Sequence, residues 1–172
     1  GIDSSQRFNF DYNQKLSGGN LKTNLTFDTT FENQNSNKWL KEGSFINTYN
    51  QNINEQFNLK LTSALETSKN YIQQTSPNND LSYSSSLHTS LDIYGYNFNK
   101  IDDNLRINIT NYQSNQKGEN NEILPTIFPY INFYSGEKNI DKYKYKYSNN
   151  IEFYNILRNS PTDINAKNQK KI

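Results

Sequence analysis

The residues best suited to chemistry are the single histidine, His88, and a serine two positions further on, Ser90. Residues two positions apart share one face of a β-strand, so this pair could act as base and nucleophile. A third polar group would have to orient the histidine, and Asp102 or Asp103 could be proposed. Both aspartates fall in an expected turn, and the surrounding alternation places His88 on a polar face. We interpret His88 as a solvated histidine among serines and expect no catalysed reaction.

Other kinds of reactive or cofactor site find little support in the composition. The chain has no cysteine, which excludes disulfides, thiolate metal sites and a cysteine nucleophile. One histidine and scattered carboxylates give no metal-ligand spacing. Gly18-Gly19 precedes an expected strand and not a helix, which argues against a phosphate-binding loop. Tyrosines alternate with lysines over 142–147, a pattern that suggests nucleic-acid stacking but is explained more simply by an aromatic girdle at a membrane interface. We expect no cofactor, metal or nucleic acid.

The dominant pattern of the chain is alternation between apolar and polar residues, which indicates β-strands with two different faces. Phe8, Phe10 and Tyr12 alternate with polar residues, and Gly18-Gly19 then supplies the conformations of a tight hairpin turn. Comparable segments recur along the chain. The expected strands lie at 8–13, 21–32, 44–50, 57–66, 83–93, 105–110, 130–134 and 142–158. The sequence therefore predicts about eight antiparallel strands and no sustained helix.

Strand length and the connections point to a membrane wall. Several expected strands exceed the five or six residues typical of globular proteins and match the roughly 9–11 needed to cross a bilayer at a tilt. Short and long polar connections also alternate, as in outer-membrane barrels. The short ones are 17–20, 52–55 and 97–103, and the long ones are 33–41, 69–80 and 115–123. We predict an all-β, antiparallel, up-and-down transmembrane β-barrel wall. A soluble twisted sheet or β-solenoid with one wet face is the alternative.

Charge and targeting add few constraints. The net charge is +1, too small to direct the chain toward nucleic acid or a membrane surface. No apolar run reaches the 18 or so residues of a membrane helix, and no N-terminal signal is present, so we expect mature sequence or part of a longer chain. Within the barrel interpretation, four cations on the polar face are expected to face the lumen and contact phosphate or sugar. They are Lys22, Lys60, Arg106 and Arg158.

Short motifs occur in a defined order along the chain from residue 67 onward. Residues 67–74 read Thr-Ser-Lys-Asn-Tyr-Ile-Gln-Gln, 111–114 read Asn-Tyr-Gln-Ser, and 123–133 read Ile-Leu-Pro-Thr-Ile-Phe-Pro-Tyr-Ile-Asn-Phe. Prolines are excluded from central ladders, so Pro125 and Pro129 are expected at the start of a strand. This order resembles the C-terminal barrel of the LPS-assembly protein LptD family, also called the organic solvent tolerance protein family. Residues 153–159, Phe-Tyr-Asn-Ile-Leu-Arg-Asn, are similar to a closing strand of that family. The positions that carry the resemblance are Tyr71, Pro125, Pro129, Leu157 and Arg158.

The resemblance implies a function and a set of partners. Residues 1–172 would form one segment of an incomplete barrel in the bacterial outer membrane, after a periplasmic jelly-roll domain and the first gate strands. The barrel would insert lipopolysaccharide into the outer leaflet. Its partners would be lipopolysaccharide, a plug lipoprotein similar to LptE, a periplasmic lipopolysaccharide bridge and outer-membrane lipid. A second hypothesis is a small stand-alone eight-stranded outer-membrane barrel with a structural or adhesion role, because eight strands can close around a side-chain-filled interior.

Overall fold

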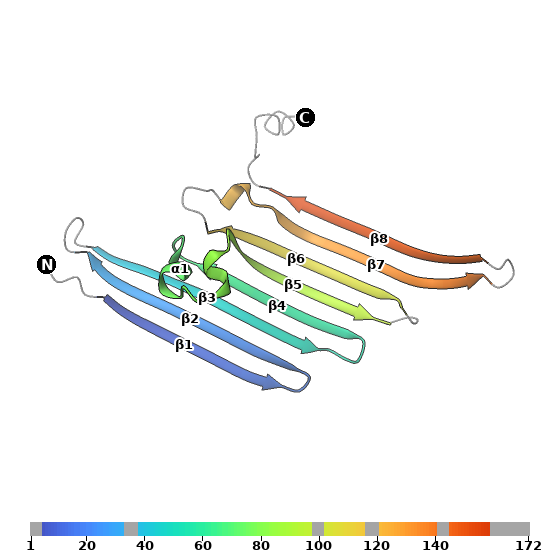
Figure 1. The fold of residues 1–172 in the computed structure, drawn as a ribbon, viewed down its shortest axis with the longest axis horizontal. Helices are drawn as coiled ribbons and strands as arrows, with labels where there is room; N and C mark the ends of the chain where they lie inside the picture. The colour runs from blue at the N-terminus through green and yellow to red at the C-terminus, as the bar shows by residue number, and fades with distance from the viewer. Residues whose placement is uncertain (1–4, 33–37, 98–101, 116–120, 141–144, 159–172) are drawn as a thin grey trace, which may run out of the picture.

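The fold is a single antiparallel sheet of eight strands that follow one another in chain order (Figure 1). The structure is a computed structural model that describes residues 5–32, 38–97, 102–115, 121–140 and 145–158. The strands are β1 (Ser5–Leu16), β2 (Gly19–Glu32), β3 (Lys38–Asn52), β4 (Phe57–Glu66), β5 (Ser86–Tyr96), β6 (Asn104–Ser114), β7 (Thr126–Ile140) and β8 (Tyr145–Leu157). The sheet is open, with β1 and β8 at its two edges. The predicted all-β, antiparallel, up-and-down order of eight strands is confirmed.

The alternation read from the sequence sets which side chains share a face. Phe8 pairs with Phe27 and Phe10 with Leu25, so apolar residues of neighbouring strands meet on one side of the sheet. We call the side that carries these residues the apolar face. The opposite side, which carries Lys60, is the polar face. The hairpin between β1 and β2 turns at Gly18, whose φ of 79° is a conformation that glycine adopts without strain.

Charged side chains are sorted almost completely between the two faces. Among the described side chains of β1 to β6, strand pairing places a single charged residue, Lys41, on the apolar face. The others share the polar face: Arg7, Asp11, Lys15, Lys22, Asp28, Glu42, Lys60, Glu66, Asp92 and Arg106. Large side chains on the apolar face are nevertheless exposed, including Phe8 at 60% and Phe10 at 55%. The apolar face therefore lacks a packing partner within the described part of the chain.

The strand ends lie along a line that the strands do not cross at a right angle, so the strands are inclined. One row of paired residues runs from Asn13 on β1 to Ile156 on β8 through Lys22, Thr48, Thr62, Ser90, Thr110 and Ile127. Asn13 lies eight residues from Ser5, whereas Ile156 lies one residue from Leu157, at the same end of the sheet. From β1 to β8 the row therefore comes seven residues closer to this end of the sheet, over seven steps from one strand to the next. With about 3.3 Å per residue and about 4.8 Å between strands, this is an inclination of roughly 35°. Figure 1 shows the result as a sheared sheet.

The connections differ between the two ends of the sheet. Those at one end cover 17–18, 53–56, 97–103 and 141–144, and those at the other cover 33–37, 67–85 and 115–125. We call these the short-connection end and the long-connection end. The predicted asymmetry holds for the two longest connections. The expected long loop at 33–41 is shorter, because β3 begins at Lys38 and not near Ser44.

Three further predictions of local structure need correction. Tyr83 was expected to open a strand, but it ends the 3-10 helix η1 (Asp80–Tyr83), and β5 begins at Ser86. The expected loop at 69–80 contains the short helix α1 (Tyr71–Thr75). A five-residue helix is too short to give a periodic signal in the sequence. Strand β7 extends to Ile140, well beyond Tyr134. A further 3-10 helix, η2 (Asn121–Ile123), precedes β7.

Residues 70–83, which we call the inward segment, fold back over the polar face. Figure 1 shows their two short helices in front of the sheet, at the long-connection end of β3 and β4. Ile72 is buried against Ala64 and Leu87, and Ile46 and Leu81 pack around this cluster. Because Ala64 and Ile46 pair on the polar face, the small hydrophobic core of the described chain lies on that side of the sheet.

Buried polar side chains fix the start and the end of the inward segment. The Glu66 carboxylate accepts hydrogen bonds from the backbone N–H groups of Asn70 (3.0 Å) and Ile72 (3.1 Å). Asn115 accepts from the same Asn70 N–H at 2.9 Å and donates to the carbonyl of Ser84 at 3.1 Å. Glu66 is the last residue of β4 and Asn115 directly follows β6, and both are at most 5% exposed. The segment is therefore attached to the sheet on both sides of its helices.

A candidate binding groove on the polar face

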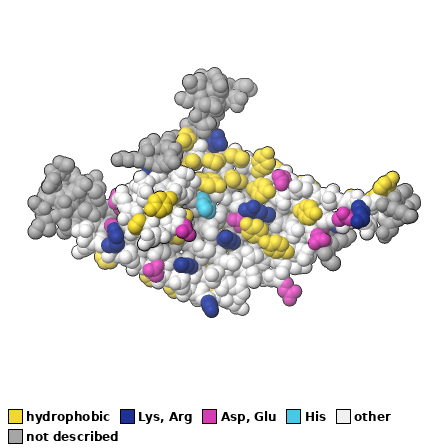
Figure 2. Space-filling model, in the orientation of Figure 1, with side chains coloured by type: hydrophobic (Ala, Val, Ile, Leu, Met, Phe, Trp, Pro, Cys, Tyr) yellow, Lys and Arg dark blue, Asp and Glu magenta, His cyan; other side chains and the backbone are white. Residues whose placement is uncertain are grey.

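A groove about 970 Å³ in volume lies on the polar face and crosses β4 to β8. Figure 2 shows this face, with hydrophobic side chains gathered beside lysine and arginine. The polar wall consists of Lys60, Thr62, His88, Ser90, Asp92, Arg106, Asn108 and Thr110. The apolar and aromatic wall consists of Tyr94, Tyr112, Ile127, Tyr130, Tyr154 and Ile156. The polar face is therefore less uniformly polar than the sequence predicted.

Strand register brings these distant residues together. Lys60, Asp92, Asn108, Tyr130 and Tyr154 stand opposite one another on five successive strands. An irregularity in the pairing of β7, around the cis peptide between Phe128 and Pro129, changes which residues point toward the groove. As a result Ile127 and Tyr130, three residues apart, both line it. A simple alternation would have placed one of them on each face.

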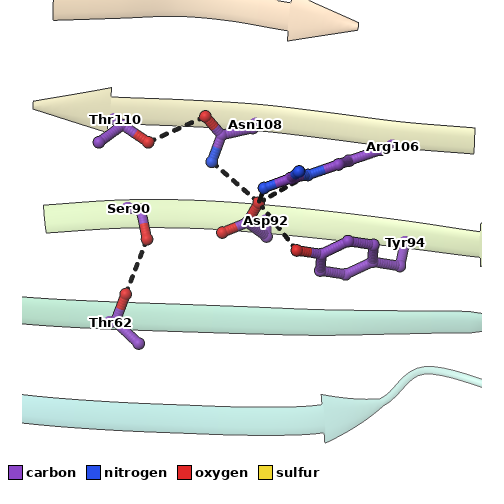
Figure 3. Close-up of polar contacts among 7 residues, drawn as sticks. All are labelled: Thr62, Ser90, Asp92, Tyr94, Arg106, Asn108 and Thr110. Carbon is purple, nitrogen blue, oxygen red and sulfur yellow. Dashed lines mark hydrogen bonds and ion pairs between the residues drawn. The ribbon is translucent and has the colours of Figure 1, made fainter. Parts of the chain in front are cut away.

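Asp92 is the centre of the polar network (Figure 3). Its Oδ1 atom accepts hydrogen bonds from Arg106 Nη2 at 3.0 Å, Asn108 Nδ2 at 2.9 Å and the Tyr94 hydroxyl at 3.3 Å. Asn108 in turn accepts a 2.9 Å hydrogen bond from Thr110. Asp92 and Asn108 are each 7% exposed, so the centre of the network is buried although the groove is open. Such a network holds its side chains in place before any ligand arrives.

Arg106 is held in position by rings as well as by charge. Its guanidinium carbon lies 5.3 Å from the ring centre of Tyr94 and 5.8 Å from that of Tyr130. Its side chain remains 46% exposed. An arginine carries five N–H donors, and the Asp92 contacts use only part of them. The groove thus presents a positioned cation between two aromatic rings, an arrangement suited to phosphate or carboxylate groups attached to sugars.

The four predicted cations have different positions. Lys60 and Arg106 both line the groove. Lys22 is exposed on the same face, opposite Thr48, but lies outside the groove. Arg158 follows the last residue of β8 and is exposed. Only Lys60 and Arg106 are therefore brought together.

The motif positions are spread over the fold. Tyr71 lies in α1 and is 1% exposed. Pro125 directly precedes β7, whereas Pro129 lies inside this strand, at the irregularity in its pairing. Leu157 is the last residue of β8. Burial, with a smaller contribution from the nearby Asp28 carboxylate, raises the pKa of Tyr71 to about 12.

The groups proposed for a hydrolytic triad are not assembled. His88 and Ser90 do share the groove, but the Ser90 hydroxyl is hydrogen-bonded to Thr62 at 2.7 Å. Asp103 forms an ion pair with Lys138 at 3.0 Å, and Asp102 lies in the turn before β6. The ring of His88 lies 6.2 Å from that of Tyr112. Within the described residues, His88 is a groove-lining side chain without an aspartate to orient it.

Several groove residues were missed by sequence reasoning. Asp92 and Asn108 were assigned to the polar face, but nothing in the sequence indicated that register would place them opposite Lys60. Tyr94, Tyr130 and Tyr154 gave no signal, because aromatic residues were expected on the other face. In the described ranges, no group of three or more His, Cys, Asp or Glu side chains is arranged to hold a metal ion. No described helix is long and apolar enough to cross a membrane.

Comparison with known proteins gives no further guide to the groove. The chain matches no protein-family model, no curated protein and no solved structure.

Proposed function

We propose that this chain is part of the wall of a bacterial outer-membrane β-barrel that passes lipopolysaccharide to the outer leaflet. The observation that carries the proposal is the separation of charge between the two faces of one sheet. In β1 to β6 the apolar face has only Lys41 among its described charged side chains, although Phe8, Phe10 and Leu25 on this face are 45–60% exposed. Contact with lipid is favourable for the apolar face, and contact with water is favourable for the polar face.

The geometry of the strands supports a barrel that crosses a bilayer. The inclination of roughly 35° matches the strand tilt of barrels. The shortest strand, β4, has 10 residues, which at this inclination extend about 27 Å along the membrane normal. That height is close to the apolar band of outer-membrane proteins, about 25 Å. Each strand is therefore long enough to cross once.

The groove supports passage of an anionic glycolipid. Lys60 and Arg106 add positive charge to a wall that also carries amide and hydroxyl groups. Sugar hydroxyls and phosphates can exchange their water for such groups, while the acyl chains stay outside the hydrated face. The order of motifs around Tyr71, Pro125 and Pro129 favours the same function. A plug lipoprotein and a periplasmic bridge belong to this proposal as partners.

Controlled depletion of the protein that carries this chain tests the proposal. We expect lipopolysaccharide to disappear from the cell surface and to accumulate on the inner side of the outer membrane or in the periplasm. The measurement is surface labelling of lipopolysaccharide in intact cells, with an unrelated outer-membrane barrel as the control for general assembly. Unchanged surface lipopolysaccharide after depletion would rule the transport function out.

The second candidate function is a stand-alone eight-stranded barrel. It is favoured by the even number of strands, since β1 and β8 would meet in antiparallel orientation if the sheet closed. Against it stands the open sheet, in which these two strands are opposite edges (Figure 1). The larger wall is therefore our preferred interpretation.

A further inference from the structure

The apolar face contains a notch where β3 lacks a side chain. The notch has a volume of about 200 Å³, and its apolar lining is Leu25, Phe27, Gly43, Phe45 and Leu65. Thr26, Ser44, Glu66 and Thr67 complete the lining. Gly43 forms its floor. A Cβ atom at this position would lie 2.7 Å from the carbonyl oxygen of Thr26, so even alanine does not fit without movement. The notch is therefore a fixed feature of the sheet surface.

A single cation stands beside the notch. Lys41 precedes Gly43 by two residues, so it shares the apolar face, and it pairs with Thr29 on β2. It is exposed, and no carboxylate of the described residues lies within ion-pair distance of it. It is also the one charged side chain that pairing puts on this face of β1 to β6 in the described ranges. A lone lysine on a lipid-facing surface requires a specific reason.

The position of Lys41 supplies that reason. Lys41 is the fourth residue of β3, close to the long-connection end of the sheet. At strand ends a bilayer offers phosphate groups, and lysine side chains near this level extend toward them. The apolar notch lies on the side of Lys41 away from the strand end, at the depth of the acyl chains. The cation and the notch are thus arranged in the same order as a lipid headgroup and its chain.

We propose that the notch binds one acyl chain of an anionic membrane lipid and that Lys41 pairs with the phosphate of that lipid. This inference rests on the proposed function, because it requires the apolar face to contact the bilayer. A volume of about 200 Å³ accepts a short run of methylene groups. The occupant is a lipid, because a lipid places an anionic headgroup and an apolar chain in the same order as Lys41 and the notch.

Quenching of a single tryptophan by brominated lipids tests this site. The chain has one tryptophan, so a Trp39→Phe background allows Phe45→Trp to place the probe in the notch. Tyr49→Trp is the matched control, because Tyr49 lies four residues further along the same face of β3 and pairs with Leu61. The full chain is reconstituted in phosphatidylcholine vesicles. Acyl-brominated phosphatidylglycerol or acyl-brominated phosphatidylcholine is then added at increasing mole fraction.

We expect a lipid preference at position 45 alone. Half-maximal quenching there should need at least a threefold lower mole fraction of brominated phosphatidylglycerol than of brominated phosphatidylcholine. At position 49 the two lipids should quench equally. Adding Lys41→Gln to the Phe45→Trp protein should abolish the preference, and Lys41→Arg should retain it. Circular dichroism of each reconstituted variant verifies that the sheet has formed.

Two different negative results separate this inference from the proposed function. If both positions are quenched but neither distinguishes the lipids, the bilayer contact is real and the lipid site is wrong. A preference that survives Lys41→Gln also overturns the site. If neither position is quenched by either lipid while the sheet is intact, the apolar face does not meet the bilayer, and the proposed function fails together with the site.

Discussion

Lys60 and Asp92 stand directly opposite each other on β4 and β5, yet the Asp92 carboxylate is taken by Arg106 from the next strand. Lys60 therefore has no ion-pair partner among the described residues, although a carboxylate faces it across the strand pair. The arrangement keeps two cations in the groove for one anion. This excess of positive charge is what the proposed passage of an anionic glycolipid requires.

The first prediction concerns the network around Asp92. Asp92→Asn keeps an acceptor for Asn108 but removes the charge that holds Arg106. Because Arg106 is 46% exposed and its ion pair partly screened, we expect the free energy of unfolding to fall by about 1–2 kcal/mol. Urea unfolding of the reconstituted protein measures this. Asp11→Asn, which changes an exposed carboxylate on the same face, should cost less than about 0.5 kcal/mol. Equal effects of the two substitutions would show that the network adds nothing.

The second prediction concerns the attachment of the inward segment. Glu66→Gln replaces one of the two oxygens that accept the Asn70 and Ile72 N–H groups with an amide that donates. The new amide N–H then faces a backbone N–H, which lowers the free energy of unfolding by about 1–3 kcal/mol. We expect faster proteolysis and faster amide exchange within 70–83. Glu152→Gln on β8 is the control, because Glu152 is exposed. Unchanged protection in Glu66→Gln would mean that the carboxylate does not hold the segment.

The third prediction follows from the raised pKa of Tyr71, about 12 in the folded protein against about 10 when unfolded. The folded state favours the neutral phenol. The stability that this provides is complete below pH 10 and is lost as the pH rises toward 12. Between pH 8 and pH 11, the free energy of unfolding of the protein should therefore fall by about 1 kcal/mol more than that of the Tyr71→Phe variant. Unfolding curves at the two pH values provide the test. Parallel losses would contradict the burial of this hydroxyl.

The fourth prediction separates the incomplete wall from a closed small barrel. If β8 paired with β1 with a shear of eight, the drifting row would continue from Ile156 to Ser5 and put Phe8 opposite Phe153. The chain has no cysteine, so Phe8→Cys with Phe153→Cys gives a clean crosslinking pair. In the intact protein we expect no disulfide between these positions. Phe8→Cys with Phe27→Cys, a neighbouring pair in the sheet, is the positive control. A disulfide between 8 and 153 would favour the stand-alone barrel.

Much of the sheet could be predicted because its strands follow simple alternation. Phe57 to Glu66 alternates except at Ser63-Ala64, and β4 has these same bounds. Where the alternation is broken, the sequence was misleading. Tyr83 has the right spacing for a strand, but it is one of the most exposed aromatic residues and ends a short helix. Isolated spacing cannot distinguish a strand residue from a loop residue that points into solvent.

The groove could not be predicted, because it depends on register between strands. Lys60 and Tyr154 are far apart in the sequence, and only the pairing of five strands places them in one row. The irregularity in β7 adds Ile127 to the polar face against the local pattern. Lys41 was missed for a different reason. The strand was expected to begin near Ser44, so the face of Lys41 was not considered.

The central claim is that the apolar face contacts lipid while the polar face contacts water, and β1 offers the most direct measurement. Phe8, Asn9, Phe10 and Asp11 are all exposed in the sheet itself, on alternating faces. Each is replaced in turn by cysteine, and the protein in intact outer membranes is treated with a charged maleimide. We expect labelling at positions 9 and 11, and labelling at 8 and 10 only after the membrane is dissolved and the protein unfolded. Equal labelling of all four positions in the membrane would contradict the claim.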